Sequence, residues 1–323
     1  MKITHTAFLT GIFTLLSFGS TPLHAGDLDL SKAVVETTPV DPWADTIRPI
    51  SNPTHFDLAI PKTQIHPIFI QNRMPDVVDT LIGKVPLGGD YQVYAIQAEI
   101  AINERLSINA TKDGYIVFDP DHTLEETNGW ANVAAGLKYA WLYEPEQRLA
   151  SNVQLLYEIP LGSEQAWQGE GDGVIIPSIA TLKHFGNLQL SHQLGFKLPI
   201  DNDTESSIFY TSAHVSYKVT DWFHPLFEVN WFNVMNEGDG GSRFQPHLGG
   251  ALPSVIAFEG GDLVNWGASN AGQNRNLVTA ALGFRIRIPD SPVDLGFAWE
   301  FPLTDEEQGL MKDRFTVDMV ISF

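Results

Sequence analysis

The sequence predicts an all-β protein, a transmembrane antiparallel up-and-down β-barrel of about twelve strands. Three observations carry this prediction. Apolar and polar residues alternate through long segments, as they do in strands that have one face toward lipid. The connections between these segments alternate between short and long. Helical periodicity is scarce after residue 26, and no window there approaches about 18 consecutive apolar residues, so no transmembrane helix is expected.

A signal peptide is predicted at residues 1–25. The chain has a positively charged start, an apolar stretch from Ala7 to Phe18, and a small residue, Ala25, at a suitable cleavage point. The apolar stretch is too short for a membrane anchor, because a spanning helix needs about 20 such residues. We therefore expect an exported chain whose mature form begins near Gly26.

Residues 26–62 contain several prolines and show no sustained period, and two interpretations stay open. A flexible periplasmic lead is the commoner state of a proline-rich terminus. A plug folded into the barrel lumen would instead give its apolar residues a place to be buried. Those apolar residues are Trp43, Ile47, Ile50, Phe56, Leu58 and Ile60. The barrel itself is expected to occupy residues 63–323.

Period-two alternation identifies the strands. In residues 130–144, Val133, Leu137 and Trp141 share one parity with other apolar residues, while small or polar residues such as Lys138 share the other. Strands are predicted at 63–71, 91–102, 104–118, 130–143, 149–161, 173–185, 188–200, 207–219, 223–236, 276–288, 293–304 and 314–323. Most are long enough to cross the apolar layer of a membrane when tilted.

The connections favour a membrane barrel over a secreted β-sandwich. Short connections are expected at Asn103, Glu144–Arg148, Gly186–Asn187, Thr220–Trp222 and Pro289–Pro292. Long ones are expected at 119–129, 162–172, 201–206, 237–275 and 305–313. Outer-membrane barrels have short periplasmic turns and longer external loops, so both termini fall in the periplasm if the strand number is even. A sandwich is the soluble alternative, but its strands average only about 5–6 residues and have polar outer faces.

Aromatic residues gather near the predicted strand ends, which fits the interfacial belts of membrane barrels. They are Tyr91, Trp130, Trp141, Tyr143, Trp222, Trp231 and Trp299. The net charge of −20 excludes nucleic acid as a partner. The chain has no cysteine, so no disulfide holds the fold together.

Parity also identifies the side chains expected to face the lumen. They are Lys138, Glu158, Lys197, His214, Lys218, Glu228, Asn230, Arg285, Arg287, Glu300, Arg314 and Asp318. These residues either line a permeation path and tune its selectivity, or pair across the lumen and stiffen the barrel. Both interpretations stay open. Twelve strands lie between the filled eight-stranded and the water-filled sixteen-stranded barrels, so a narrow or partly plugged lumen is expected.

The expected partners are the outer-membrane lipid and lipopolysaccharide, and an unnamed small solute. Acidic residues dominate the predicted outer loops, and bridging to lipopolysaccharide phosphates through divalent cations is the alternative to a merely solvated surface. The C-terminal Phe323, which closes an alternating strand, resembles the recognition signal of the barrel-insertion machinery.

No catalytic residue, metal site or cofactor is predicted. The chain lacks the G-x-S-x-G, H-E-x-x-H, P-loop and G-x-G-x-x-G motifs, and its histidines do not have metal-ligand spacing. An enzyme is therefore not expected. A barrel enzyme would need a Ser–His or Asp–His pair on one face of the sheet at one height.

Five strings resemble an outer-membrane β-barrel transporter family akin to the "MetA-pathway of phenol degradation" barrels. They are Ala110–Gly114, Tyr157–Gly162, Glu228–Trp231, Phe258–Leu263 and Glu300–Thr304. The resemblance covers the chain from about residue 50 onward, and the family offers no established functional residues to transfer. It implies a channel for passive passage of small molecules, hydrophobic or aromatic ones among them. A non-transporting structural or surface-interaction barrel is the alternative.

Overall fold

The structure, a computed structural model, describes residues 41–241 and 252–323. The predicted signal peptide at 1–25 and the following residues up to 40 lie outside the described residues. None of the helices in the described ranges is long and apolar enough to cross a membrane. They are α1, Leu252–Val255, and single 3-10 turns at Glu164–Ala166, Ala271–Asn274 and Glu306–Gln308.

Antiparallel strands make up nearly all of the fold. They are β1 Gln64–Arg73, β2 Val77–Thr80, β3 Gly83–Pro86, β4 Asp90–Ala101, β5 Leu106–Lys112, β6 Tyr115–Asp119, β7 Thr127–Trp130, β8 Val133–Glu144, β9 Leu149–Ile159, β10 Val174–Phe185, β11 Leu188–Pro199, β12 Ser207–Tyr217, β13 Phe223–Asn236, β14 Asn276–Arg287, β15 Val293–Pro302 and β16 Asp313–Ser322.

The main sheet closes on itself. Each strand pairs with its neighbour in the chain from β8 to β16, and β1 pairs with both β16 and β4. The sheet contains fourteen strands, but β5 with β6 and β7 with β8 each form one interrupted wall strand, so the wall has twelve. The predicted fold class is confirmed. Closure removes the free edges that hydrocarbon cannot satisfy with hydrogen bonds.

The observed strands begin and end within a few residues of the predicted ones, with three differences. The predicted strand 130–143 begins earlier, at Thr127, and is interrupted at residues 131–132 between β7 and β8. The predicted strand 104–118 is interrupted at Gly114, which has φ +125 and where a Cβ atom would lie 2.8 Å from the carbonyl oxygen of Tyr94. The hairpin formed by β2 and β3 was not predicted, because strands of four residues are too short to show a period of two.

The two faces of the wall differ as the alternation predicts. On β8, Lys138 is fully buried whereas the neighbouring Leu137 is 54% exposed, and Tyr139 and Trp141 are exposed on the same side. Large apolar side chains recur on the outer side of most wall strands, while polar and charged side chains point inward. This is the arrangement of a barrel that faces lipid outside and is polar inside.

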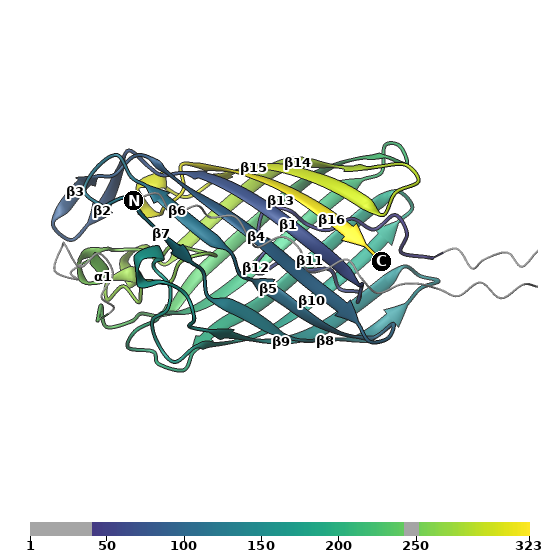
Figure 1. The fold of residues 1–323 in the computed structure, drawn as a ribbon, viewed down its shortest axis with the longest axis horizontal. Helices are drawn as coiled ribbons and strands as arrows, with labels where there is room; N and C mark the ends of the chain where they lie inside the picture. Colours follow the sequence, from purple (N-terminus) through teal and green to yellow (C-terminus); the bar gives the residue numbers. More distant parts are fainter. Residues whose placement is uncertain (1–40, 242–251) are drawn as a thin grey trace, which may run out of the picture. The chain divides into compact units, whose positions relative to one another are not determined.

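The connections separate into two ends of the barrel (Figure 1). The hairpin β2–β3 and helix α1 lie at one end, which we call the long-loop end, and the C-terminus of β16 lies at the opposite, short-turn end. The short connections fall at 102–105, 145–148, 186–187, 218–222 and 288–292, and the long ones at 74–89, 120–126, 160–173, 200–206, 237–275 and 303–312.

Candidate functional site: a plugged lumen with a cavity at each end

Residues 41–62, which we call the plug segment, run inside the barrel before β1 begins. Every residue from Thr46 to Ile60 is buried. The segment starts beside the short turns, reaches farthest inward near Pro53, where it meets wall residues such as Val93, and returns to the short-turn end. Residues 46–60 thus lie buried inside the barrel, while the interpretation of 26–62 as a lead or a plug stays a prediction.

Wall side chains complete the hydrogen bonds of the plug backbone, which forms no strand. Gln189 of β11 accepts from the N–H of Ile47 (2.9 Å) and donates to its carbonyl (2.8 Å). Glu228 of β13 accepts from the N–H groups of Ile50 (3.0 Å) and Ser51 (2.7 Å). A buried backbone group without a partner is costly, so these side chains make it possible for an irregular chain to lie in the lumen.

Asp57 is the centre of a buried ion-pair network. Its carboxylate lies 2.9 Å from Arg48 of the plug segment and 2.7 Å from Lys138 of β8. Lys138 in turn lies 2.8 Å from Glu99 of β4. All of these side chains are at most 5% exposed. Charges removed from water require partners, and here the plug segment supplies partners that the wall alone does not.

A second network fixes the opposite side of the plug segment. Arg285 of β14 donates to the carbonyl oxygen of Arg48 (3.0 Å) and lies 2.8 Å from Asp318 of β16. His66 of β1 lies 2.6 Å from the same carboxylate. Gly296 leaves the space for this network, since a Cβ atom there would lie 2.1 Å from Asp318. The plug is thus held from both sides of the lumen.

The predicted lumen residues come from the inward side of the wall, and most of them bond to each other, to other wall residues, to the plug segment or to the loops. Buried among them are Lys138, Glu158, Lys197, His214, Glu228, Asn230, Arg285, Glu300, Arg314 and Asp318. Lys218 and Arg287 are partly exposed at the short-turn end. Their inward placement follows from parity, whereas whether they line a permeation path stays a prediction.

Several residues of the site were not identified from the sequence. Arg48 and Asp57 lie in a segment without periodicity, so no face could be assigned to them. Glu99 lies on the polar parity of β4, where the alternation was sufficient to find it, whereas Lys112 shares the parity of the outward Ile108 and turns inward only after the register shift between Ala110 and Lys112. Asp262 lies in a long loop, and only its contact with Arg314 reveals its position.

Residues 252–275 of the long connection after β13 cover the lumen at the long-loop end. Asp262 of the 237–275 connection lies 2.8 Å from Arg314 of β16, whose guanidinium also donates to the Tyr91 hydroxyl (3.0 Å). Aromatic rings continue this layer. Successive ring centroids from Tyr91 through Phe118, Trp167 and Trp266 to Phe258 lie 5.2, 4.1, 5.2 and 5.7 Å apart.

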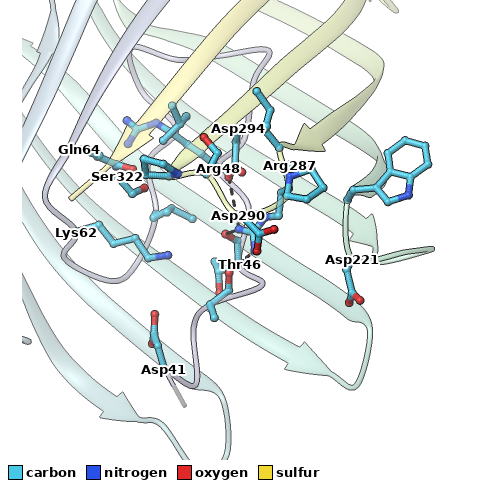
Figure 2. Close-up of a pocket in the computed structure, with 18 residues that line it drawn as sticks. Asp41, Thr46, Arg48, Lys62, Gln64, Asp221, Arg287, Asp290, Asp294 and Ser322 are labelled. Atoms are coloured by element: carbon cyan, nitrogen blue, oxygen red, sulfur yellow. Dashed lines mark hydrogen bonds and ion pairs between the residues drawn. The ribbon is translucent and has the colours of Figure 1, made fainter. Parts of the chain in front are cut away.

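A polar cavity of about 520 Å³, which we call the vestibule, opens at the short-turn end between the plug segment and the wall. Figure 2 shows Lys62 of the plug segment and Asp221 of the 218–222 turn on opposite sides of it. Arg287 of β14 crosses to the plug segment and donates to the carbonyl oxygens of Ala44 and Thr46, the latter at 2.7 Å. The vestibule is large enough for a small solute and ends on the buried part of the plug segment.

An apolar cavity of about 230 Å³, which we call the outer pocket, lies at the long-loop end. The hairpin β2–β3, the loop at 123–124, helix α1 and the aromatic layer surround it. Its lining residues are Val78, Thr80, Ile82, Val85, Pro86, Leu87, Thr123, Leu124, Leu252, Val255, Ile256, Phe258, Trp266 and Leu310.

The pair of His66 and Asp318 has the residue types of a catalytic acid–base pair. Both side chains are 1% exposed, and the two ring nitrogens of His66 are occupied by Asp318 (2.6 Å) and Gln97 (3.2 Å). No nucleophile bonds to this imidazole within the described ranges, and the pair is part of the plug-holding network. The same ranges contain no group of three or more His, Asp or Glu residues placed to hold a metal.

Comparison with known proteins gives a fold and no family. No family profile and no curated protein matches the sequence. Among solved structures, the chain is similar to the COG4313 outer membrane channel from Pseudomonas putida F1, with a TM-score of 0.56, 14% identity, and coverage of 81% of this chain and 96% of that one. At this identity the likeness shows that the fold is that of an outer-membrane barrel.

Two further structures are looser matches. The KdgM porin in complex with disordered oligogalacturonate has a TM-score of 0.44 and 8% identity, covering 80% of this chain and 99% of that one. The outer membrane protein OprD from Pseudomonas aeruginosa has a TM-score of 0.37 and 9% identity, with coverage of 85% and 96%. Neither likeness is close enough to argue from, and the link to the phenol-degradation barrels stays a prediction.

Proposed function

We propose that this chain is an outer-membrane channel for the passive passage of small molecules, hydrophobic or aromatic ones among them. One observation carries the proposal. The plug segment contributes no strand to the wall, and all twelve wall strands pair with one another without it. The lumen can therefore open by movement of the plug segment and of residues 252–275 while the barrel stays closed around it.

The orientation follows from the lengths of the connections. With short turns in the periplasm, the vestibule faces the periplasm and the outer pocket faces the cell exterior. Phe323, the last residue after β16, is 79% exposed at the short-turn end, where the insertion machinery would meet it. The acidic outer loops would meet lipopolysaccharide, directly or through divalent cations.

A non-transporting surface barrel is the second candidate, because the plug segment and the aromatic layer together fill the described lumen. The cavity beside Pro53 at the plug tip supports this alternative, since its volume is only about 20 Å³. The two functions differ in whether the lumen ever opens.

Single-channel recording in planar bilayers tests the proposal, together with uptake of small aromatic solutes into vesicles that have a lipopolysaccharide outer leaflet. That leaflet slows direct permeation of apolar molecules, so a channel produces a measurable acceleration. We expect discrete openings and faster uptake than in protein-free vesicles. A barrel that is correctly inserted but shows neither would establish the non-transporting alternative.

A further inference from the structure

The outer pocket offers a ligand almost no polar contact. No charged residue lines it, and its two hydroxyl groups are already used by the protein. Thr80 donates to the carbonyl oxygen of Gly83 (2.7 Å) and Thr123 to that of Pro86 (2.6 Å). A molecule bound here is therefore held by apolar contact, and a charged or strongly polar molecule would lose its hydration without compensation.

The rim of the outer pocket is exposed to solvent, and its base is formed by buried side chains. Ile82, at the tip of the β2–β3 hairpin, is 77% exposed, whereas Phe258 and Trp266 on the opposite side are each 1% exposed. The hairpin is fixed to the α1 segment by a hydrogen bond from the N–H of Leu81 to the carbonyl oxygen of Val255 (3.0 Å) and by a bridge between Thr80 and Ile256. These contacts hold the walls of the cavity in place, so binding requires little ordering of the protein.

The size of the pocket limits the ligand. An apolar cavity of about 150 Å³ stays dry and binds benzene. The outer pocket measures about 230 Å³, which leaves room for one aromatic ring and a small substituent. Pockets for drug-sized ligands generally have volumes of about 300–1,000 Å³, so the outer pocket is too small for such a ligand.

The base of the pocket is continuous with the lumen. Trp266 is the next ring after Phe258 in the aromatic layer that extends to Tyr91 on β4. The same buried apolar cluster includes Ile68 and Val93, which also line the small apolar cavity beside Pro53 at the plug tip. An apolar molecule in the outer pocket therefore lies against an unbroken apolar layer that reaches the plug segment.

We propose that the outer pocket is a binding site for a small, neutral, apolar molecule of about one substituted aromatic ring, taken up from the exterior. This inference rests on the proposed function, because it identifies where the solute first binds. It adds a site and a ligand size that the channel proposal does not contain.

Bromobenzene is a suitable probe, because bromine can be located in crystals by anomalous scattering. In crystals of the full chain soaked with bromobenzene, we expect an anomalous peak inside the outer pocket. A parallel crystal grown with a detergent brominated on its alkyl chain separates a free small molecule from a lipid chain. A peak from the detergent that bromobenzene does not displace would show a lipid site and overturn the proposal, as would bromobenzene bound only elsewhere.

Affinity is measured by equilibrium dialysis of bromobenzene against the protein in lipid nanodiscs, with protein-free nanodiscs as the background. Ile82→Asp places a charge at the rim and should weaken binding about tenfold, equivalent to about 1.4 kcal/mol. Leu81→Asp is the matched control, because Leu81 is exposed on the same turn but does not line the pocket, and it should leave binding unchanged. Equal affinities in both variants would overturn the assignment.

The binding and transport results are separable. Pocket binding without any channel opening would leave this site standing and remove the proposed function. Channel activity that is insensitive to Ile82→Asp, in a protein that does not retain bromobenzene, would leave the channel standing and remove the site. The difference in migration between unheated and heated samples on denaturing gels verifies that each variant is folded.

Discussion

The carboxylate of Asp57 lies 2.7 Å from the ammonium group of Lys138, and this contact joins the plug segment to the barrel wall. Both side chains are buried, so the pair has little water around it to replace a lost partner. Because the wall closes without the plug segment, weakening this contact acts on the position of the plug rather than on the barrel. The ion pair is therefore the first place to test whether the plug moves.

Asp57→Asn should increase channel opening. The substitution leaves Arg48 and Lys138 with one carboxylate fewer, and removing one partner of a buried ion pair typically costs about 3–5 kcal/mol. We expect more frequent and longer openings in single-channel recordings. Asp41→Asn, at the exposed start of the plug segment, is the control and should behave as the wild type. Unchanged recordings for Asp57→Asn would show that this pair does not hold the lumen closed.

Arg287→Ala should release the start of the plug segment at the vestibule. Arg287 donates to the carbonyl oxygens of Ala44 and Thr46, and alanine cannot replace these hydrogen bonds. We expect faster proteolytic cleavage within residues 41–47, detected by mass spectrometry, with the barrel itself still resistant. Lys218→Ala is the control. It removes the same positive charge, but Lys218 pairs with Asp221 and not with the plug segment. If both variants are cleaved at the wild-type rate, Arg287 does not fasten the segment.

The wall could be predicted from the sequence because its signal is local. Alternation along β8 already separates Leu137 from Lys138, and closure of the sheet only brings such strands together. The lumen candidates followed from the same parity. Their partners did not, because pairing depends on residues far apart in the chain.

The plug segment lacked any such local signal. Its backbone is satisfied by Gln189 and Glu228, which come from strands more than a hundred positions later in the chain. The outer pocket could not be predicted from the sequence either, since it combines a hairpin whose strands have only four residues each with a loop far away in the chain. Apolar residues such as Ile47 and Ile50 indicated that the segment could be buried, but they did not indicate which part of the protein would bury them.

Leu137→Arg tests whether the outer face meets lipid. Leu137 is 54% exposed near the middle of β8, and arginine on the lipid face of a barrel near the bilayer midplane costs roughly 2–4 kcal/mol. We expect the free energy of unfolding, measured by urea titration in lipid vesicles, to fall by this amount. Leu81→Arg lies on the β2–β3 turn outside the wall and should have little effect. Equal losses for the two variants would contradict a lipid-facing wall.

Glu205 should make the long-loop end sensitive to pH. It lies in the 200–206 loop, where the next residue, Ser206, donates to Glu259 (2.6 Å) and thereby joins this loop to the 237–275 loop. Burial and the nearby negative charge of Glu158 raise the pKa of Glu205 from 4.5 to about 7; Glu259 acts in the same direction, and Lys197 and Lys112 oppose it. Its Oε2 atom is buried without a hydrogen-bond partner among the described residues.

The sign of the effect follows from the protons bound in each state. Between about pH 4.5 and 7 the folded loop retains a proton that the opened loop has lost, so folding is favoured by low pH. The stabilisation is complete below the unfolded pKa and is lost as the pH rises through about 7, when a buried carboxylate must carry its charge beside Glu158. After correction for intrinsic rates, hydrogen exchange at residues 200–206 should be roughly 10- to 100-fold faster at pH 8 than at pH 5. Glu205→Gln should abolish this difference, whereas the exposed Glu164→Gln should retain it; a difference that survives Glu205→Gln would assign the titration to another group.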